Sequence, residues 1–149
     1  MSANKRVLIV DDDHDIRRGA HFRLRAAGYE TLQAENGRRG VDSAEESSPD
    51  AIVMDVRMPE VDGIEAMKQL RCMPRTRNIP VVIVSASPCE ETSALEQGAR
   101  YFLRKPYSAS ALVAAVNAVT DGSQNDTHQA TVAKVTACGE RQTALSGRV

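Results

Sequence analysis

The chain alternates short apolar runs with longer segments of helical hydrophobic spacing. Three runs are continuous and rich in β-branched residues, Val7–Val10, Ala51–Met54 and Val81–Val84, which is typical of strands buried on both faces. A shorter run, Tyr101–Leu103, predicts another strand, and the alternating segment Glu30–Ala34 predicts an edge strand. We therefore expect five strands in this chain.

Helical spacing fills the segments between these runs. A first helix is predicted over Asp15–Ala27 and ends at Gly28. Its inward-facing stripe is expected to consist of Ile16, Ala20, Leu24 and Ala27. A last helix follows an N-cap at Ser108. Its i, i+3, i+4, i+7 stripe consists of Leu112, Ala115, Val116 and Val119.

Three more helices are predicted between these two. One begins at Asn36-Gly37 and ends before Ser48-Pro49, one spans Ile64–Arg71, and a short one spans Glu90–Gln97 and ends at Gly98. This alternation of strands and helices predicts an α/β fold with a doubly wound parallel sheet and helices on both faces. Ligands of such sheets bind at the carboxyl ends of the strands.

The periodic pattern ends near residue 120. We predict one domain over residues 5–120, followed by a polar tail over residues 121–149 that is disordered or contains one short helix. The tail has no aromatic residue, and its aliphatic residues are sparse. A tail of this length is too short for a second domain with its own core.

Composition excludes several classes of function. The net charge of −1 gives no electrostatic reason to expect a nucleic-acid or membrane partner. The N-terminal apolar run is too short for a signal peptide or a membrane span, so we expect the protein in the cytoplasm. The three cysteines include no CxxC pair, which argues against a zinc site and favours reduced thiols.

Acidic, hydroxyl and basic side chains follow four of the predicted strands. Asp11 and Asp12 follow the first strand, Asp55 the third, Ser85 the fourth and Lys105 the fifth. Because the carboxyl ends of parallel strands meet at one edge of a sheet, we expect these side chains to gather there. The alternative, that each is a solvated turn residue, does not explain why all three kinds follow separate strands.

This set of groups suits phosphoryl chemistry. Clustered carboxylates repel one another, and Mg²⁺ prefers oxygen ligands with one or two carboxylates and a phosphate. Asp11, Asp12 and Asp55 can supply these ligands. A carboxylate such as Asp55 can accept a phosphoryl group, with Lys105 and Ser85 able to stabilise its oxygens.

Four motifs carry a resemblance to a known family. They are Val7–Asp13, Ile52–Pro59 with Asp62-Gly63, Ile79–Ala86, and Leu103–Tyr107. In this order they resemble the receiver domains of two-component response regulators, over about residues 5–120. The resemblance is to a stand-alone receiver of the chemotaxis type and implies a (βα)₅ flavodoxin-like fold with strand order 2-1-3-4-5.

The resemblance also implies roles for individual residues. Asp55 would be the phosphoacceptor. Mg²⁺ would be held by Asp11, Asp12, Asp55 and the backbone carbonyl of Arg57. Ser85 and Lys105 would bind the phosphoryl group. Phe102 would be a switch residue that turns inward. The peptide bond before Pro106 would be cis. Asp13 is expected to be a loop residue and not a ligand.

By the same resemblance, a sensor histidine kinase or histidine phosphotransfer protein would exchange the phosphoryl group. The chain would catalyse only its own phosphorylation and dephosphorylation, and would switch a downstream protein partner through the fourth helix, fifth strand and fifth helix. Ser85 and Lys105 are 20 positions apart, closer than is usual in the family. This spacing leaves the length of the fourth helix and the form of the output surface open.

Two alternative functions remain at this point. A phosphohydrolase of the haloacid dehalogenase type would use Asp11 and Asp13 as nucleophile and acid–base, but it needs a further acidic pair after Lys105 and leaves Asp55 unexplained. A scaffold that acts without phosphorylation would not need the set of acids with Ser85 and Lys105.

Overall fold

The computed structural model describes residues 4–121 and contains a parallel sheet of five strands in the order β2-β1-β3-β4-β5. The strands are β1 (Arg6–Val10), β2 (Glu30–Ala34), β3 (Ala51–Asp55), β4 (Val81–Ser85) and β5 (Tyr101–Arg104). The predicted fold class and strand order are confirmed. The predicted tail, apart from Asp121, lies outside the described residues.

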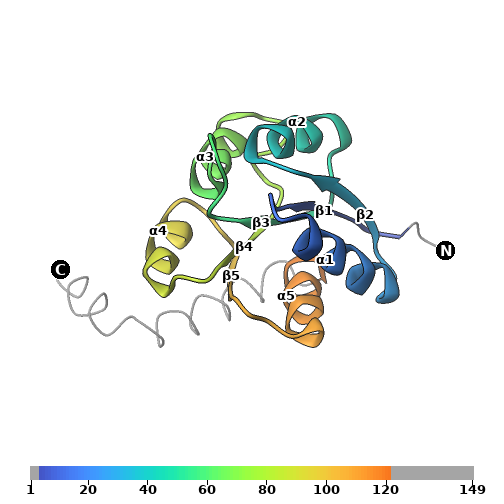
Figure 1. Ribbon diagram of the computed structural model, residues 1–149. Coiled ribbons are helices and arrows are strands. Elements are labelled where there is room, and N and C mark those ends of the chain that lie inside the picture. Colours follow the sequence, from blue (N-terminus) through green and yellow to red (C-terminus); the bar gives the residue numbers. More distant parts are fainter. Residues whose placement is uncertain (1–3, 122–149) are drawn as a thin grey trace.

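Helices cover both faces of this sheet (Figure 1). They are α1 (His14–Ala26), α2 (Gly37–Ser47), α3 (Gly63–Cys72), α4 (Glu91–Glu96) and α5 (Ala109–Asp121), with a 3₁₀ turn, η1 (Pro88–Glu90), directly before α4. Side chains of α1 and α5 pack on one face, and side chains of α2, α3 and α4 pack on the other. No helix within residues 4–121 is long and apolar enough to cross a membrane.

Alternate residues of the central strands form two apolar layers. In β1, Val7 and Ile9 face α1 and α5, while Leu8 and Val10 face α2 and α3. The same alternation runs through β3 and β4, whose residues are all buried. Burial on both faces explains why these strands read as continuous apolar runs in the sequence.

Short polar residues and glycines set the helix ends. Asp13, Asn36 and Asp62 cap α1, α2 and α3 by accepting hydrogen bonds from backbone N–H groups of the first turn. Ser108 accepts from the Ala111 N–H at 3.1 Å at the start of α5. Gly28, just after α1, has a φ of 101°, which favours glycine. These ends lie within one or two residues of the predicted ones.

The predicted inward stripe of α1 is only half right. Ala20 and Leu24 are buried, at 1% and 0% exposed, but Ile16 is 37% exposed. Ile16 lies in the first turn, where α1 borders an open groove instead of another helix. Ala27 is also exposed, because it is the C-cap, where the chain leaves the helix and the helical spacing no longer applies.

The segment between β4 and β5 is short, as its spacing in the sequence indicates. The helix predicted over Glu90–Gln97 has six residues, Glu91–Glu96, and its first predicted residue belongs to η1. Gly98 follows with a φ of 109° and turns the chain into β5. The short α4 therefore starts within a few residues of the end of β4.

Gly63, the first residue of α3, packs directly against the end of β3. A Cβ atom at this position would lie 2.3 Å from the carbonyl oxygen of Asp55 and 2.9 Å from Cα of Val56. We expect Gly63→Ala to destabilise the fold by about 1–3 kcal/mol, because the backbone on both sides must move. Urea denaturation measures the loss, and amide chemical shifts should place the movement at Asp55.

Gly19 provides the matched control for this substitution. It lies inside α1, and a Cβ atom there would meet nothing within 4 Å. Gly19→Ala should therefore stabilise the fold by about 0.5–1 kcal/mol through the higher helix propensity of alanine. Equal stability of the two variants would contradict the close packing of α3 against the strand end.

Candidate phosphoacceptor and metal site

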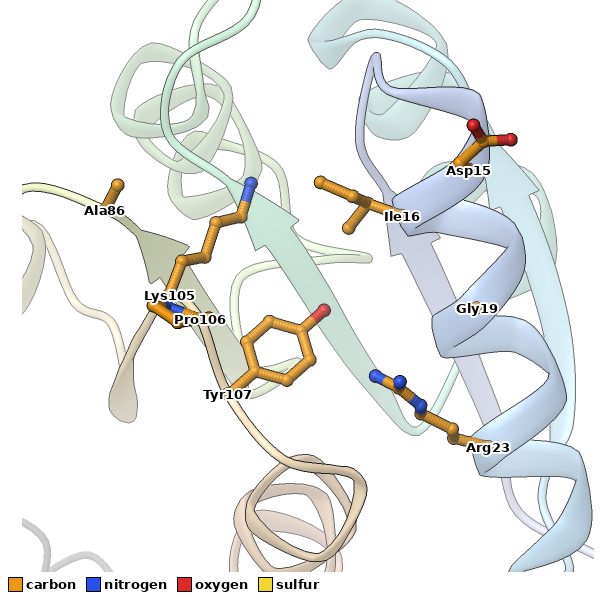
Figure 2. Close-up of a pocket in the computed structure, with 8 residues that line it drawn as sticks. All are labelled: Asp15, Ile16, Gly19, Arg23, Ala86, Lys105, Pro106 and Tyr107. Carbon is orange, nitrogen blue, oxygen red and sulfur yellow. The ribbon is translucent and has the colours of Figure 1, made fainter.

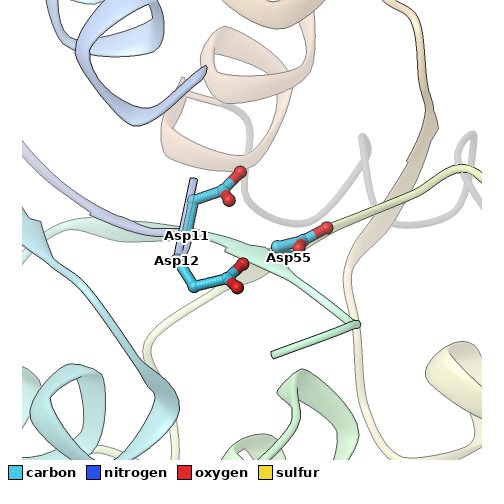
Figure 3. A group of neighbouring side chains, drawn as sticks. All are labelled: Asp11, Asp12 and Asp55. Atoms are coloured by element: carbon cyan, nitrogen blue, oxygen red, sulfur yellow. The ribbon is translucent and has the colours of Figure 1, made fainter. Parts of the chain in front are cut away.

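Three carboxylates meet at the carboxyl edge of the sheet (Figure 3). Asp11 and Asp12 directly follow β1, and Asp55 is the last residue of the neighbouring strand β3. One oxygen from each lies within 4.8 Å of the others. Asp11 and Asp55 are buried, at 5% and 6% exposed, whereas Asp12 is exposed. The predicted gathering of these acids at one edge is what the structure shows.

Lys105 brings a positive charge to the same place. Its Nζ lies 3.0 Å from Oδ1 of Asp55 and 3.7 Å from Oδ2 of Asp11. Lys105 directly follows β5, and its backbone N–H donates to the Ser85 carbonyl at 2.9 Å. The end of β4 therefore fixes the backbone of Lys105, and the Lys105 side chain reaches across to the acids.

Burial changes the proton affinities of this group. Desolvation raises the pKa of Asp55 to about 6, because the hydrogen bond and charge of Lys105 only partly offset burial and the negative charge of Asp11. Burial also raises the pKa of Asp11. For Lys105, burial lowers the pKa, but the hydrogen bond and charge of Asp55 outweigh it, so the pKa is raised overall. A bound cation would favour the ionised carboxylates.

The loop after β1 fixes Asp11 and gives Asp13 a different task. Oδ1 of Asp11 accepts from the Asp13 N–H at 2.9 Å, and Nη1 of Arg17 donates to the Asp11 carbonyl at 2.7 Å. The Asp13 carboxylate accepts from Asp15 and Ile16 N–H groups at the start of α1. Asp13 is thus engaged in capping, which suits a loop residue and not a ligand or acid–base group.

Ser85 lies at the end of β4 and is 1% exposed. Its hydroxyl donates to the Glu90 carboxylate and accepts from the Ser87 N–H at 3.0 Å. The other Glu90 oxygen accepts from Nε of Arg57 at 3.2 Å. Sequence reasoning missed Glu90 and also Arg17, because no motif marks either residue. Only the close spacing of Ser85 and Lys105 indicated that this segment is unusual.

The loop between β3 and α3 carries Arg57. Its neighbour Val56 is fixed by two backbone hydrogen bonds, from its own N–H to the Val84 carbonyl at 3.1 Å and from the Gly63 N–H to its carbonyl at 2.8 Å. The backbone at Arg57 therefore follows directly after a residue that is fixed beside Asp55, although the Arg57 side chain is 73% exposed. A fixed backbone at this point suits a carbonyl ligand.

The remaining predicted residues lie on or just after β5. Phe102 is 6% exposed and packs in the apolar layer with Ile83 and Ala94. An inward movement of Phe102 would thus start from a side chain that is already buried. The Lys105–Pro106 peptide bond is cis.

A groove of about 490 Å³ borders the site on the side of α1 (Figure 2). It lies between α1 and the loop after β5, and its lining includes Ile16, Arg23, Lys105 and Tyr107. In Figure 2 the Tyr107 hydroxyl points toward α1, and the Lys105 amine points toward the strand ends. Burial raises the pKa of Tyr107, with a further contribution from the charge of Asp11. The groove thus opens beside Lys105.

Comparison with known proteins identifies the family that this chain resembles. The chain matches the response regulator receiver domain over residues 7–117. It is 40% identical over 116 residues to the transcriptional regulatory protein PrrA of Mycobacterium tuberculosis, covering 76% of this chain and 49% of PrrA. It is 38% identical over 120 residues to protein PilH of Pseudomonas aeruginosa, covering 78% of this chain and 98% of PilH.

Solved structures agree with this match. The chemotaxis protein CheY4 of Vibrio cholerae superposes with a TM-score of 0.73 at 31% identity, covering 77% of this chain and 98% of CheY4. The receiver domain of the sensor histidine kinase PA1611 of Pseudomonas aeruginosa superposes with a TM-score of 0.72 at 28% identity, covering 77% and 96%. That structure has a magnesium ion coordinated in its active-site cleft.

The chain belongs to the response regulator receiver domain family of two-component signalling. It spans about half the length of PrrA, the transcriptional regulator reported above. Receiver domains are in general signalling modules and not enzymes with a separate substrate, and they bind Mg²⁺ at an acidic pocket. The acids, hydroxyl and lysine predicted from the sequence lie at the strand ends of this receiver.

Proposed function

We propose that this receiver accepts a phosphoryl group on Asp55, with Mg²⁺ bound by the neighbouring acids. The observation that carries the proposal is that Asp55 lies beside both the lysine that can stabilise a phosphoryl group and the acids that can bind Mg²⁺. Its carboxylate lies 3.0 Å from the Lys105 ammonium, and one of its oxygens lies within 4.8 Å of one oxygen each of Asp11 and Asp12. The backbone of Asp55 is also held in place, because this residue ends a fully buried strand.

The proposed transfer uses a phosphohistidine donor. An oxygen of the ionised Asp55 forms a bond to phosphorus, the bond from phosphorus to the imidazole nitrogen breaks, and its electron pair returns to the imidazole. Because the pKa of Asp55 is about 6, its carboxylate is mainly ionised at neutral pH even without a cation. The product is an aspartyl phosphate, and hydrolysis of its P–O bond returns phosphate and restores Asp55.

The donor set suits Mg²⁺, which takes oxygen ligands and keeps several waters. Asp11, Asp12 and Asp55 would hold the ion together with the backbone carbonyl of Arg57. When bound, the ion neutralises negative charge on the phosphoryl oxygens. Two of these acids are buried and desolvated, which is costly for ionised carboxylates without a cation.

The chain's own residues would then stabilise the phosphoryl group. Lys105 can exchange its contact with Asp55 for one with a phosphoryl oxygen, because it is already within reach. Ser85 lies on the adjacent strand β4 and can donate to another oxygen. A donor protein would approach from the side of the groove that Ile16 and Lys105 line, because Lys105 contacts Asp55.

The expected partners are a sensor histidine kinase or a histidine phosphotransfer protein. The output would pass to a downstream protein through the face of α4, β5 and α5, with Ser85 and Phe102 as switch residues. Because Phe102 is already buried, its part would be to repack within the interior beside Ala94 of α4. We propose no nucleic-acid or membrane partner, because a net charge of −1 gives no electrostatic reason to expect one.

Acetyl phosphate tests this proposal. With Mg²⁺, intact mass measurement should find one added phosphoryl group, which hydroxylamine removes because an acyl phosphate is sensitive to it. Absence of any acyl phosphate would favour a scaffold that acts without phosphorylation. Steady hydrolysis of simple phosphate esters would favour the phosphohydrolase, although the capping role of the Asp13 carboxylate does not suit that mechanism.

A further inference from the structure

The hydroxyl of Ser85 makes its hydrogen bonds away from Asp11, Asp12 and Asp55. It is almost completely buried and accepts from the Ser87 N–H at 3.0 Å. Its nearest acceptor is the Glu90 carboxylate, and the Ser87 carbonyl is a more distant acceptor at 3.4 Å. Under the proposed function, the hydroxyl proton must be donated to a phosphoryl oxygen on Asp55. A serine hydroxyl has one proton to donate, so Glu90 and the phosphoryl oxygen exclude each other as acceptors.

Glu90 is placed for this contact by the short connection after β4. It is the last residue of η1, and its own N–H donates to the Ser87 carbonyl at 3.2 Å. This tight turn brings the Glu90 side chain back over the end of β4, where it is 23% exposed. Its second oxygen accepts from Nε of Arg57 at 3.2 Å, so the loop after β3 also holds it.

We propose that Glu90 is a positioning residue that holds Ser85 in the unphosphorylated arrangement and must be displaced when Asp55 is phosphorylated. The proposal rests on the function assigned to Asp55. A phosphoryl group would compete with the Glu90 carboxylate for the single Ser85 proton. Once displaced, Glu90 loses its bond to Ser85. Because α4 begins at the next residue, this release acts directly on the start of α4.

The affinity for beryllofluoride, which mimics the phosphoryl group on Asp55, tests the inference. With Mg²⁺ present, Glu90→Ala should bind beryllofluoride about tenfold more tightly than the wild type, because one hydrogen bond to a charged group no longer has to be broken. Glu90→Gln keeps a weaker, neutral acceptor and should fall between the two. Without beryllofluoride, amide signals of Ser85 and Ser87 in Glu90→Ala should shift toward their bound positions.

A double-mutant cycle separates positioning from a merely structural role. In the Ser85→Ala background, Glu90→Ala should leave beryllofluoride affinity unchanged, because the competing hydroxyl is absent. Glu96→Ala is the matched control, since Glu96 is an exposed glutamate at the end of α4, the helix that Glu90 directly precedes. It should bind with wild-type affinity.

Three results would overturn the inference while leaving the function of Asp55 intact. They are wild-type affinity in Glu90→Ala, an equal gain in the Glu96→Ala control, and a gain from Glu90→Ala that persists without the Ser85 hydroxyl. If the wild type itself failed to bind beryllofluoride with Mg²⁺, the proposed function would fail as well. The experiment therefore distinguishes the two failures.

Discussion

Asp55→Asn should take up no phosphoryl group from acetyl phosphate under conditions in which the wild type takes up one. The reason is chemical, because a carboxamide has no anionic oxygen to attack phosphorus. The substitution is nearly isosteric, so the strand and the layers beneath it should stay in place. Intact mass after incubation with acetyl phosphate and Mg²⁺ measures the loss, and far-UV circular dichroism checks the fold.

Asp42→Asn is the control for this change. Asp42 is exposed on α2, outside the acidic cluster, so the variant should be phosphorylated at the wild-type rate. If Asp55→Asn still carried one hydroxylamine-sensitive phosphoryl group, the acceptor would be another carboxylate. Peptide mapping would then decide between Asp11 and Asp12.

Asp55→Asn should also be more stable than the wild type at neutral pH when Mg²⁺ is removed. Burial raises the pKa of Asp55 from 3.8 to about 6 in the folded state. Between these values the folded protein keeps a proton that the unfolded chain has lost. The free energy of unfolding of the wild type therefore falls as the pH rises through this window.

The difference between the two proteins isolates this contribution. Asp55→Asn does not titrate at position 55, so its advantage over the wild type should be small below pH 3.8 and should grow to about 3 kcal/mol above pH 6. Asp11, whose pKa is also raised, affects both proteins in the same direction. Urea denaturation in EDTA across this pH range measures the two curves, and parallel curves would contradict a desolvated Asp55.

Mg²⁺ should narrow this difference at neutral pH. The ion binds ionised carboxylates in the folded state, so it stabilises the wild type by about 2.7 kcal/mol at a concentration one hundred times its dissociation constant. Asp55→Asn has lost one carboxylate ligand and should gain less at the same concentration. An equal gain in both proteins would mean that the ion binds away from Asp55.

Local patterns in the sequence were enough for the framework of this receiver. Continuous β-branched runs predicted the buried strands, since a strand covered on both faces has no polar side. Ser108 before α5, Asn36-Gly37 at the start of α2 and Gly28 after α1 predicted helix ends, because such preferences depend only on the nearest turn. The edge where Asp55 and Lys105 meet also followed, because parallel strands end on one side.

The tertiary structure alone decided contacts that depend on the paths of the loops. Ile16 follows the helical spacing of a buried residue, yet it is exposed because α1 borders a groove at that point. Phe102 is already buried because α4 and β4 cover it. No spacing rule joins Glu90 to Ser85 and Arg57, since that contact requires a turn after β4 to meet a loop after β3.

Residue order thus determined which segments form strands and helices, and which chemical groups stand at the strand ends. These properties depend on neighbours within a few positions along the chain and on the geometry of parallel sheets. The structure determined which group each side chain meets and how far it is desolvated, including the raised pKa of Asp55. Those properties depend on segments that are distant in sequence and become neighbours only when the chain folds.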